Sequence, residues 1–521
     1  MRAGLSCENN AQTERSSVTL WAGMLFTMLL SVYVITMSGH HYSVDGMAMY
    51  QQAKPLLFHG SFKFSPPFRW HAYVTPYTYW SEGLSIVYMV PLAVFAFLVF
   101  PDNPSFRVMP ATEVQLLNDP SFRFVGLTNA ALTALTACAL FLIATRLGMR
   151  RRTAAAMTLV YGLASPALAY QKEDFAQPLA TLLVVAAVLL YLRATDARPG
   201  WRGKLWMWAV GLCVGFLVTT RSESLLIVAP VFVALAVLRA RALPGSRDKV
   251  ATVAAILIPL IAFVGFHLYV NHVKEGQVLA LRGAFKFDLA AWLRGLTGSL
   301  ASPGRGFVTF FPLALFAPRG LRRMWVGGLR MPALTFGALI VLHVMLFAGW
   351  PCWWGGVSWG PRFLVPILPI ATLLAFWQHP VGETGCRVWR CFSGSTMAAA
   401  VLLGLAMSLT GTLLRWDYNA AQRAAECGFP DYDAPSGRGS WCFRIESNPL
   451  HANWRDLGHP SRYDLLLLQP STRQSPAWKI MFAGAFVSLA VSGMVLAHCL
   501  LRGKPTDVAA RGSIDPRLSH L

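Results

Sequence analysis

Long apolar runs separated by short polar segments make up most of this chain. The runs are about 17–25 residues long, which is the length that a helix needs to cross a lipid bilayer. The candidate spans are residues 17–37, 124–145, 153–168, 176–195, 205–220, 224–238, 250–270, 306–317, 331–349, 362–378, 394–413 and 479–500. The pattern predicts an all-α polytopic membrane protein, a bundle of about 12–13 transmembrane helices in which neighbouring protein completes the shorter spans.

The polar segments between the runs differ in charge. Basic clusters occupy residues 146–152, 193–204, 239–249, 318–330 and 501–504. With the spans above, all of them and the N-terminus fall on one side of the membrane. Lys and Arg are enriched in cytoplasmic loops, so this side is predicted to be cytoplasmic.

One apolar stretch does not fit a simple count of spans. Residues 84–100 are apolar but are interrupted by Pro91. A full crossing here would place every later basic cluster outside. We therefore expect this stretch to be re-entrant, to lie on the surface, or to pair with a return through 101–122, since irregular backbone at membrane depth is tolerated where protein covers it.

Composition agrees with a membrane protein and excludes a nucleic-acid partner. Hydrophobic residues make up 55% of the chain and charged residues 13%, about half the charged fraction of a soluble domain. The formal net charge of +21 comes largely from short clusters between apolar runs. No basic soluble domain is present to bind a nucleic acid.

The other side of the membrane receives the remaining polar segments. They are the loops at 38–82, 169–175, 271–305 and 350–362, and the stretch 414–478. We predict a membrane domain over 1–413, a small external soluble segment over 414–478, a last span over 479–501 and a cytoplasmic tail over 502–521. Cys427 and Cys442 lie in the external segment, where an oxidising compartment favours a disulfide between them.

The first external loop begins HHYSVDGMAMYQQAKPLLFHG and places Asp45 just beyond the first span. An acid at this boundary can act as a general base that takes a proton from an acceptor hydroxyl. Asp is also a favoured residue at a helix N-cap. Spacing leaves both roles open.

Two further loops place basic and acidic residues together. In YQKEDFAQP, Lys172 can meet a phosphate that Asp174 helps to orient, although solvation is the more common role of charges in a short turn. Arg221 and Glu223 follow an apolar run. Charges near the hydrocarbon boundary indicate a functional site, and a local ion pair at a helix junction is an equal alternative.

The strongest cluster is WPCWWGGVSWGPRFLVPILP. It holds Trp354 and Trp359 and ends in Arg362 at the mouth of a span. Tryptophans at a boundary can form an interfacial belt, but their packing with glycines and an arginine favours a site for a sugar ring and a phosphate. In SPGRG, Arg305 stands between two glycines before a span, which suits either an anion or a snorkelling side chain.

Together these segments resemble the GT-C superfamily of glycosyltransferases. The resemblance rests on SVDGMAMYQQAKPLLFHGSF, YQKEDFAQPLATLLVV, RSESLLIVAP, SPGRGFVTFFP and GGVSWGPRFLVPILP, in this order, and covers most of residues 17–378. The sequence is similar to bacterial relatives of protein O-mannosyltransferases, lipid A aminoarabinose transferases and arabinofuranosyltransferases.

The resemblance implies a function and a set of site residues. It implies inverting transfer of a sugar from a polyprenyl-phosphate carrier on the external face of the plasma (inner) membrane, with Asp45 as the base. The basic residues matched to binding of the donor phosphate are Arg362, Arg305, Arg221 and Lys172. The predicted site also includes Trp354 and Trp359, from the tryptophan cluster, and the supporting acids Asp174, Glu223 and Glu82.

The chain departs from those relatives that carry paired acids in the first loop, because Val44 and Gly46 flank Asp45. A lone carboxylate is a poor cation site, so the resemblance identifies no metal and implies no resident cofactor. The donor is the lipid-linked sugar, and the acceptor is a glycan, a lipid or a protein.

Two other functions compete with this one. A transporter or flippase of a lipid-linked glycan also needs basic groups near lipid. It is expected to show inverted repeats or polar residues down to the midplane, whereas the charges here gather at one boundary. The third alternative is an inactive binding or assembly factor.

Overall fold

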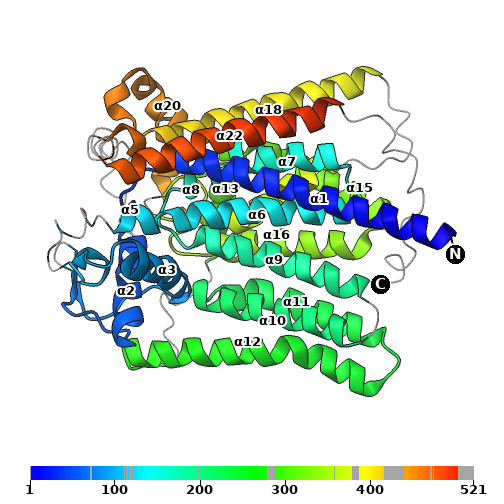
Figure 1. Ribbon diagram of the computed structural model, residues 1–521, viewed down its shortest axis with the longest axis horizontal. Coiled ribbons are helices and arrows are strands. Elements are labelled where there is room, and N and C mark those ends of the chain that lie inside the picture. The colour runs from blue at the N-terminus through cyan, green and yellow to red at the C-terminus, as the bar shows by residue number, and fades with distance from the viewer. Residues whose placement is uncertain are drawn as a thin grey trace.

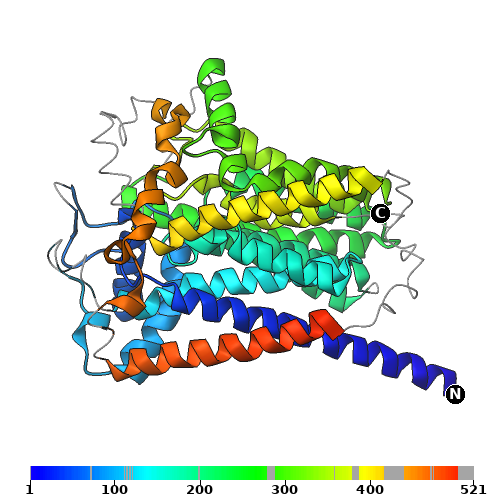
Figure 2. The same cartoon turned by 90° about the horizontal axis from the view of Figure 1, so that it is seen from above.

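The structure is a computed structural model of a helical bundle (Figures 1 and 2). It describes residues 2–70, 73–110, 112, 115, 119, 121–197, 200–278, 288–356, 358–377, 387–415, 439–469, 472 and 475–502. Within these residues, nine helices are long and apolar enough to cross a membrane. They are α1 (Arg2–Ile35), α6 (Leu127–Arg146), α9 (Gln177–Asp196), α10 (Trp201–Thr220), α11 (Ser224–Arg241), α12 (Ser246–Glu275), α16 (Arg330–Ala348), α18 (Arg387–Leu413) and α22 (Pro476–Arg502).

These helices coincide with nine of the twelve predicted spans, which confirms the prediction of an all-α polytopic membrane protein. The remaining three predicted spans are short or broken helices. They form α7 (Arg151–Leu163) with α8 (Ala167–Tyr170), α14 (Phe307–Phe310) with η3 (Pro312–Phe316) and α15 (Ala317–Val326), and η4 (Arg362–Ile367) with α17 (Leu368–Phe376).

Prolines explain the breaks. Pro312 stands at the start of η3 and Pro366 lies inside η4, and proline removes a backbone donor and disturbs the preceding turn. Neighbouring helices cover these segments closely. A Cβ atom on Gly320 of α15 would stand 1.7 Å from the Leu374 carbonyl oxygen of α17, so these two segments pack backbone against backbone, and irregular backbone is tolerated where protein covers it.

The two ends of the bundle differ in the way that the charge pattern predicts. Figure 1 shows the N-terminus and the α9–α10 and α11–α12 connections at one end, which we name the basic end because the basic clusters lie there. α2 (Val44–His59), α3 (Gly83–Val94) and α20 (Pro449–Asn453) lie at the opposite end, which we name the loop end.

The stretch at 84–100 lies along the surface of the loop end, one of the three predicted possibilities. α3 continues as a π-helical turn, η1 (Phe95–Val99), and is followed by η2 (Pro104–Phe106). A Cβ atom on Gly83 would stand 2.8 Å from the Cα atom of Thr220, the last residue of α10. Lys54 of α2 donates to the carbonyl oxygen of Ser105 at 2.7 Å, so this stretch is held by α10 at its start and by α2 just beyond its end.

Short elements complete the loop end. They are the antiparallel strands β1 (Phe68–Trp70) and β2 (Tyr73–Thr75), the helices α5 (Phe122–Val125) and α13 (Leu289–Ala301), and, between α18 and α22, η6 (Ser440–Phe443), η7 (Ile445–Ser447), η8 (Trp454–Gly458), η9 (Pro460–Arg462) and η10 (Leu466–Leu468). Cys442 is buried against Trp353, Trp354 and Trp441. Cys427 lies outside the described residues, so its disulfide with Cys442 stays a prediction.

Candidate active site

The start of α2 places Asp45 at the loop end. Ser43 is the N-cap residue, and its hydroxyl oxygen accepts a hydrogen bond from the amide of Gly46 at 3.0 Å. Capping is therefore the role of Ser43. Asp45 stands in the first turn of the helix with its side chain 18% exposed, which leaves the carboxylate available for another partner.

Asp174 holds the first turn of α2 in place. Its buried carboxylate accepts from the hydroxyl of Ser43 at 3.1 Å and from the amide of Tyr42 at 3.3 Å, and lies 2.8 Å from Nδ1 of His41. A Cβ atom on Gly46 would stand 2.2 Å from Cγ of Asp174. Only glycine lets the helix approach this closely, so the short loop at 169–175 sets where Asp45 lies.

Arg362 is the direct partner of Asp45. Its Nη2 donates to Oδ2 of Asp45 at 2.6 Å, and its guanidinium lies 4.0 Å from the ring centre of Phe175. Gly355, which turns the chain ahead of η4, has φ +80°, and a Cβ atom there would stand 2.8 Å from Cβ of Arg362. The glycine-rich loop thus permits the approach that brings together two residues 317 positions apart.

Gln177, the first residue of α9, joins Arg362 to a second arginine. Its side-chain amide faces two guanidinium groups, which have only N–H donors, so its oxygen must point toward them. In that orientation the oxygen accepts from Nε of Arg362 at 3.1 Å and from Nη1 of Arg221 at 2.9 Å. Arg221 in turn donates through Nε to Oε1 of Glu223 at 2.6 Å.

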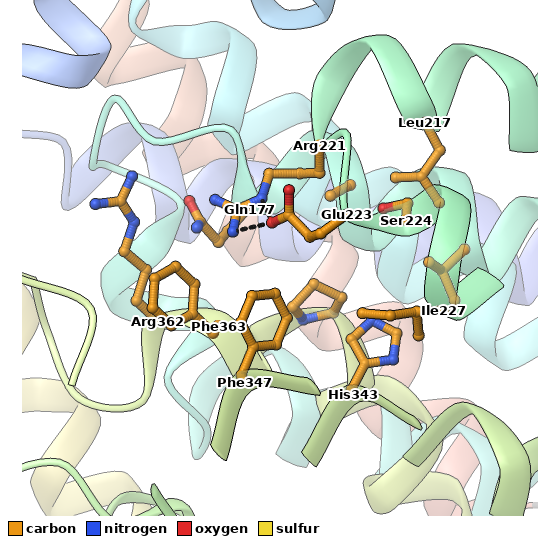
Figure 3. Close-up of a pocket in the computed structure, with 13 residues that line it drawn as sticks. Gln177, Leu217, Arg221, Glu223, Ser224, Ile227, His343, Phe347, Arg362 and Phe363 are labelled. Atoms are coloured by element: carbon orange, nitrogen blue, oxygen red, sulfur yellow. Dashed lines mark hydrogen bonds and ion pairs between the residues drawn. The ribbon is translucent and has the colours of Figure 1, made fainter. Parts of the chain in front are cut away.

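These contacts form one continuous chain, Asp45–Arg362–Gln177–Arg221–Glu223, which we name the five-residue network. Figure 3 shows Arg362, Gln177, Arg221 and Glu223 along the upper edge of a small, partly open pocket. Phe347 and Phe363 lie beneath Arg221, with their ring centres 5.9 and 5.3 Å from its guanidinium carbon. The pocket therefore has a charged rim.

The walls below this rim are mostly apolar, with Ser224 and His343 as polar exceptions, and come from five elements. They are formed by Ala180 and Val184 of α9, Leu217 of α10, Ile227 of α11, Phe347 of α16, and Phe363 and Pro366 of η4. Positive groups at the mouth and hydrocarbon below suit a ligand with an anionic head and an apolar chain. Such a ligand is amphipathic, as a membrane lipid with a phosphate group is.

Lys172 lies in a different network. Its ammonium group, with no side-chain exposure, donates to the carbonyl oxygen of Thr412 at 2.6 Å and to Asp464 at 3.0 Å. Asp464 also binds Nε2 of His40 at 2.8 Å and the hydroxyl of Tyr42. Burial alone would raise the pKa of Asp464, but Lys172 and His40 hold that pKa well below its usual range. We name Lys172, Asp464, His40 and Tyr42, which are joined through their side chains, the closed network.

Glu82 and Arg305 have partners outside the five-residue network. Arg305 nevertheless lies beside it, because Nη1 of Arg362 donates to the carbonyl oxygen of Gly355 at 3.5 Å, next to the Gly356 that Arg305 contacts. Glu82 is buried and lies 3.0 Å from Nδ1 of His267 and 3.8 Å from Nζ of Lys274, both on α12. Arg305 is buried, donates to the carbonyl oxygen of Gly356 at 3.2 Å and stacks on Trp441 at 5.1 Å. These contacts tie α3 to α12 and connect the loops at the loop end.

Trp354 and Trp359 are buried, each 2% exposed. A Cβ atom on Gly439 would stand 2.6 Å from the ring of Trp354, and one on Gly411 would stand 2.3 Å from the ring of Trp359. Both indoles thus pack face-on against glycines, which places them in the core in this conformation of the chain.

Sequence reasoning missed Gln177 and His343. Gln177 is uncharged and begins an apolar run, and its one signal is a polar residue at the mouth of a span. His343 lines the pocket (Figure 3). Its Nδ1 lies 2.7 Å from the Leu339 carbonyl oxygen, an acceptor, so in the neutral ring the proton sits on Nδ1. Among the described residues, no group of three or more His, Cys, Asp or Glu is arranged to hold a metal ion.

Comparisons with solved structures gave distant matches. ArnT from Cupriavidus metallidurans in the apo state matches with 14% identity over 93% of this chain and 78% of that chain, with a TM-score of 0.49. The same protein bound to undecaprenyl phosphate matches with 16% identity over 84% and 78%, with a TM-score of 0.47. The oligosaccharyltransferase AglB from Archaeoglobus fulgidus, in complex with an inhibitory peptide and a dolichol-phosphate, matches with 13% identity over 82% of this chain and a TM-score of 0.45.

This chain spans 60% of the length of that archaeal protein. A comparison with curated proteins gave no match. Residues 99–274 match the model of the dolichyl-phosphate-mannose-protein mannosyltransferase family. The matched stretch contains Gln177, Arg221 and Glu223. Over the residues that it covers, this match confirms the GT-C resemblance and the prediction of a membrane glycosyltransferase.

Proposed function

We propose that this protein transfers a sugar from a polyprenyl-phosphate carrier to an acceptor hydroxyl, at the external face of the plasma membrane and with inversion at the sugar. The observation that carries the proposal is that two arginines, Arg221 and Arg362, meet at the mouth of a mostly apolar pocket, where Arg362 is in contact with Asp45. The matched family acts on a sugar carried by dolichyl phosphate, which supports a lipid-phosphate donor.

Each side of the reaction has a group in place. Asp45 takes the proton of the acceptor hydroxyl while the oxygen of that hydroxyl forms a bond to the anomeric carbon. The bond from that carbon to the phosphate oxygen breaks, and the electron pair leaves with the polyprenyl phosphate. The sugar passes through an oxocarbenium-like state, and the negative charge that develops on the phosphate is stabilised by the fixed guanidinium groups.

The ion pair between Asp45 and Arg362 must open during this reaction. The two side chains are in direct contact at 2.6 Å, so a sugar cannot stand between them until they separate. A donor phosphate offers Arg362 an alternative anion, because two of its oxygens can accept from the planar fork of the guanidinium. Binding of the donor thus releases the carboxylate of Asp45 toward the acceptor and places the phosphate on the opposite side of the sugar.

The test is transfer in proteoliposomes that contain the full chain. Radiolabelled polyprenyl-phosphate hexose, pentose and aminopentose are each supplied with extracted envelope glycans, lipids or proteins as acceptors. We expect label to move from at least one donor, and Asp45→Asn to lower the rate by about 10²–10⁴-fold, the usual contribution of a general base.

A matched control is available on the same face. Asp102 is an exposed acid in a turn at the loop end, and Asp102→Asn should retain the full rate. Movement of the intact lipid-linked sugar across the bilayer without transfer would instead identify a flippase and overturn the proposal. Full activity of a folded Asp45→Asn variant would reject the base while leaving the transfer reaction intact.

A further inference from the structure

We propose that Gln177 is a positioning residue that holds Arg221 and Arg362 as one anion clamp. This inference rests on the proposed function and deepens it, because it names the group that makes a single phosphate site from two separate arginines. Gln177 is 1% exposed and lies between the two guanidinium groups, and one amide oxygen accepts from both, at 2.9 and 3.1 Å.

Without such a group the two arginines would repel each other. Both guanidinium groups stay charged, and repulsion between like charges grows as water is excluded. The side chains of Arg221 and Arg362 are only 17% and 12% exposed. A neutral amide oxygen between them supplies partial negative charge without adding an anion that would compete with a phosphate.

The ends of the five-residue network explain why position 177 holds an amide and not an acid. Arg362 is held by Asp45 and Arg221 by Glu223, so two carboxylates already balance the two arginines. A third carboxylate in the centre would make the network net negative and would repel a phosphate. Each guanidinium carries five N–H donors, so both can bind phosphate oxygens while they keep the amide.

The backbone at Gln177 strengthens the same site. Gln177 is the first residue of α9, a helix of 20 residues. The N-terminus of a helix carries partial positive charge and favours a nearby anion. The side chain of Thr181 donates to the carbonyl oxygen of Gln177 at 2.7 Å, which adds a constraint on the first turn. Helix α9 therefore places Gln177, and with it the side-chain amide, at the rim of the pocket.

The experiment measures binding of a polyprenyl phosphate and of the matching uncharged polyprenol to the full chain in nanodiscs. The difference between the two affinities isolates the contribution of the phosphate. We expect Gln177→Leu to weaken binding of the phosphate by about tenfold or more, the equivalent of losing one or two charge-assisted contacts, and to leave binding of the polyprenol unchanged. Gln177→Glu, which is nearly isosteric, should weaken phosphate binding as well.

Gln171→Leu is the matched control. Gln171 is a buried glutamine at the same end of the bundle, and its Nε2 donates to the hydroxyl of Thr36 at 3.1 Å, away from the arginines. Its loss should alter both affinities equally or not at all. A second readout is coupling: after Arg221→Gln, the further change Gln177→Leu should cost much less phosphate affinity than it does alone.

The outcomes separate this inference from the proposed function. If the unaltered protein binds the phosphate no better than the polyprenol, the proposed function fails. If it prefers the phosphate, and Arg221→Gln and Arg362→Gln abolish that preference while Gln177→Leu and Gln177→Glu keep it, the clamp is wrong and the proposed function stands. Equal weakening of phosphate and polyprenol by Gln177→Leu would show a purely structural role and would also overturn the clamp.

Discussion

The loop end contains two charged networks built from the same kinds of residue. The five-residue network borders a pocket, and the side chains of Arg362 and Asp45 are 12% and 18% exposed. In the closed network, the side chains of Lys172 and Asp464 are 0% and 3% exposed, and only His40, at its edge, is 19% exposed. Both networks join distant parts of the chain, yet one faces space that a ligand can enter and the other does not.

The difference teaches that the role of a charged residue near the membrane, structural or ligand-binding, depends on its surroundings rather than on the type of residue. A buried ion pair gains Coulomb energy but loses hydration, so its net effect on stability is small while it is intact. Removing one partner leaves an unpaired buried charge. The closed network should therefore control folding, whereas the five-residue network should control ligand binding.

The largest expected effect comes from breaking the closed network. Lys172→Met leaves Asp464 buried without its ammonium partner, which should cost about 3–5 kcal/mol of unfolding free energy. Equilibrium unfolding in mixed micelles measures this loss. The double change Lys172→Met with Asp464→Leu should recover most of it, because no buried charge remains.

Arg362→Gln is the matching change in the five-residue network. It should abolish phosphate binding while altering stability far less than Lys172→Met does. Comparable losses of stability in the two variants would erase the distinction between the networks.

The second largest effect should come from acid, which should weaken the closed network. Lys172 and His40 hold the pKa of Asp464 below its usual range. A carboxyl group whose folded pKa is depressed stabilises the fold above its unfolded pKa of about 4, and this stabilisation is lost as the pH falls toward the folded pKa. We expect the stability difference between the unaltered protein and Asp464→Asn to shrink as the pH falls below about 4. A difference that stays constant down to pH 2 would contradict this assignment.

Gly46→Ala should have a smaller effect on stability and should act on the five-residue network through its neighbour. The added methyl group would stand 2.2 Å from Cγ of Asp174 and 2.3 Å from its carbonyl oxygen. Overpacking of this kind costs about 1–3 kcal/mol, and the shift of α2 would carry Asp45 away from Arg362, so the transfer rate should fall as well.

Gly23→Ala in α1 is the control, because a Cβ atom there meets nothing within 4 Å. A Gly46→Ala variant with normal stability and a normal transfer rate would show that the start of α2 is not held by Asp174.

The sequence could predict the longer helices and which loops share an end of the bundle, because an apolar run of about 20 residues and a basic loop are local signals. It also gathered Asp45, Arg221 and Arg362 at one end. It could not predict which charged side chains pair with each other. Asp464 lies 292 positions from Lys172, and nothing local separates Lys172, which the structure pairs with Asp464, from an arginine at the pocket.

Two further limits have physical causes. Gln177 was missed because a neutral amide at the start of an apolar run carries no charge signal, although it lies at the centre of the five-residue network. Trp359 was matched to a sugar because aromatic clusters at a boundary suit sugars as well as cores. Its packing on Gly411 depends on how α18 crosses the loop at 350–362, which no local pattern encodes.

An ion pair at the basic end provides the smallest expected effect and the sharpest check on burial. Nζ of Lys204 donates to Oδ1 of Asp248 at 2.7 Å, with the two side chains 35% and 48% exposed. The atoms are closer than those of Lys172 and Asp464, but solvent screens them, so Lys204→Met should cost less than about 1 kcal/mol. The same substitution is thereby made in a short exposed pair and a longer buried one. If unfolding in mixed micelles gave the larger loss for Lys204→Met, separation and not burial would decide the strength of these pairs, and the division between the two networks at the loop end would lose its physical basis.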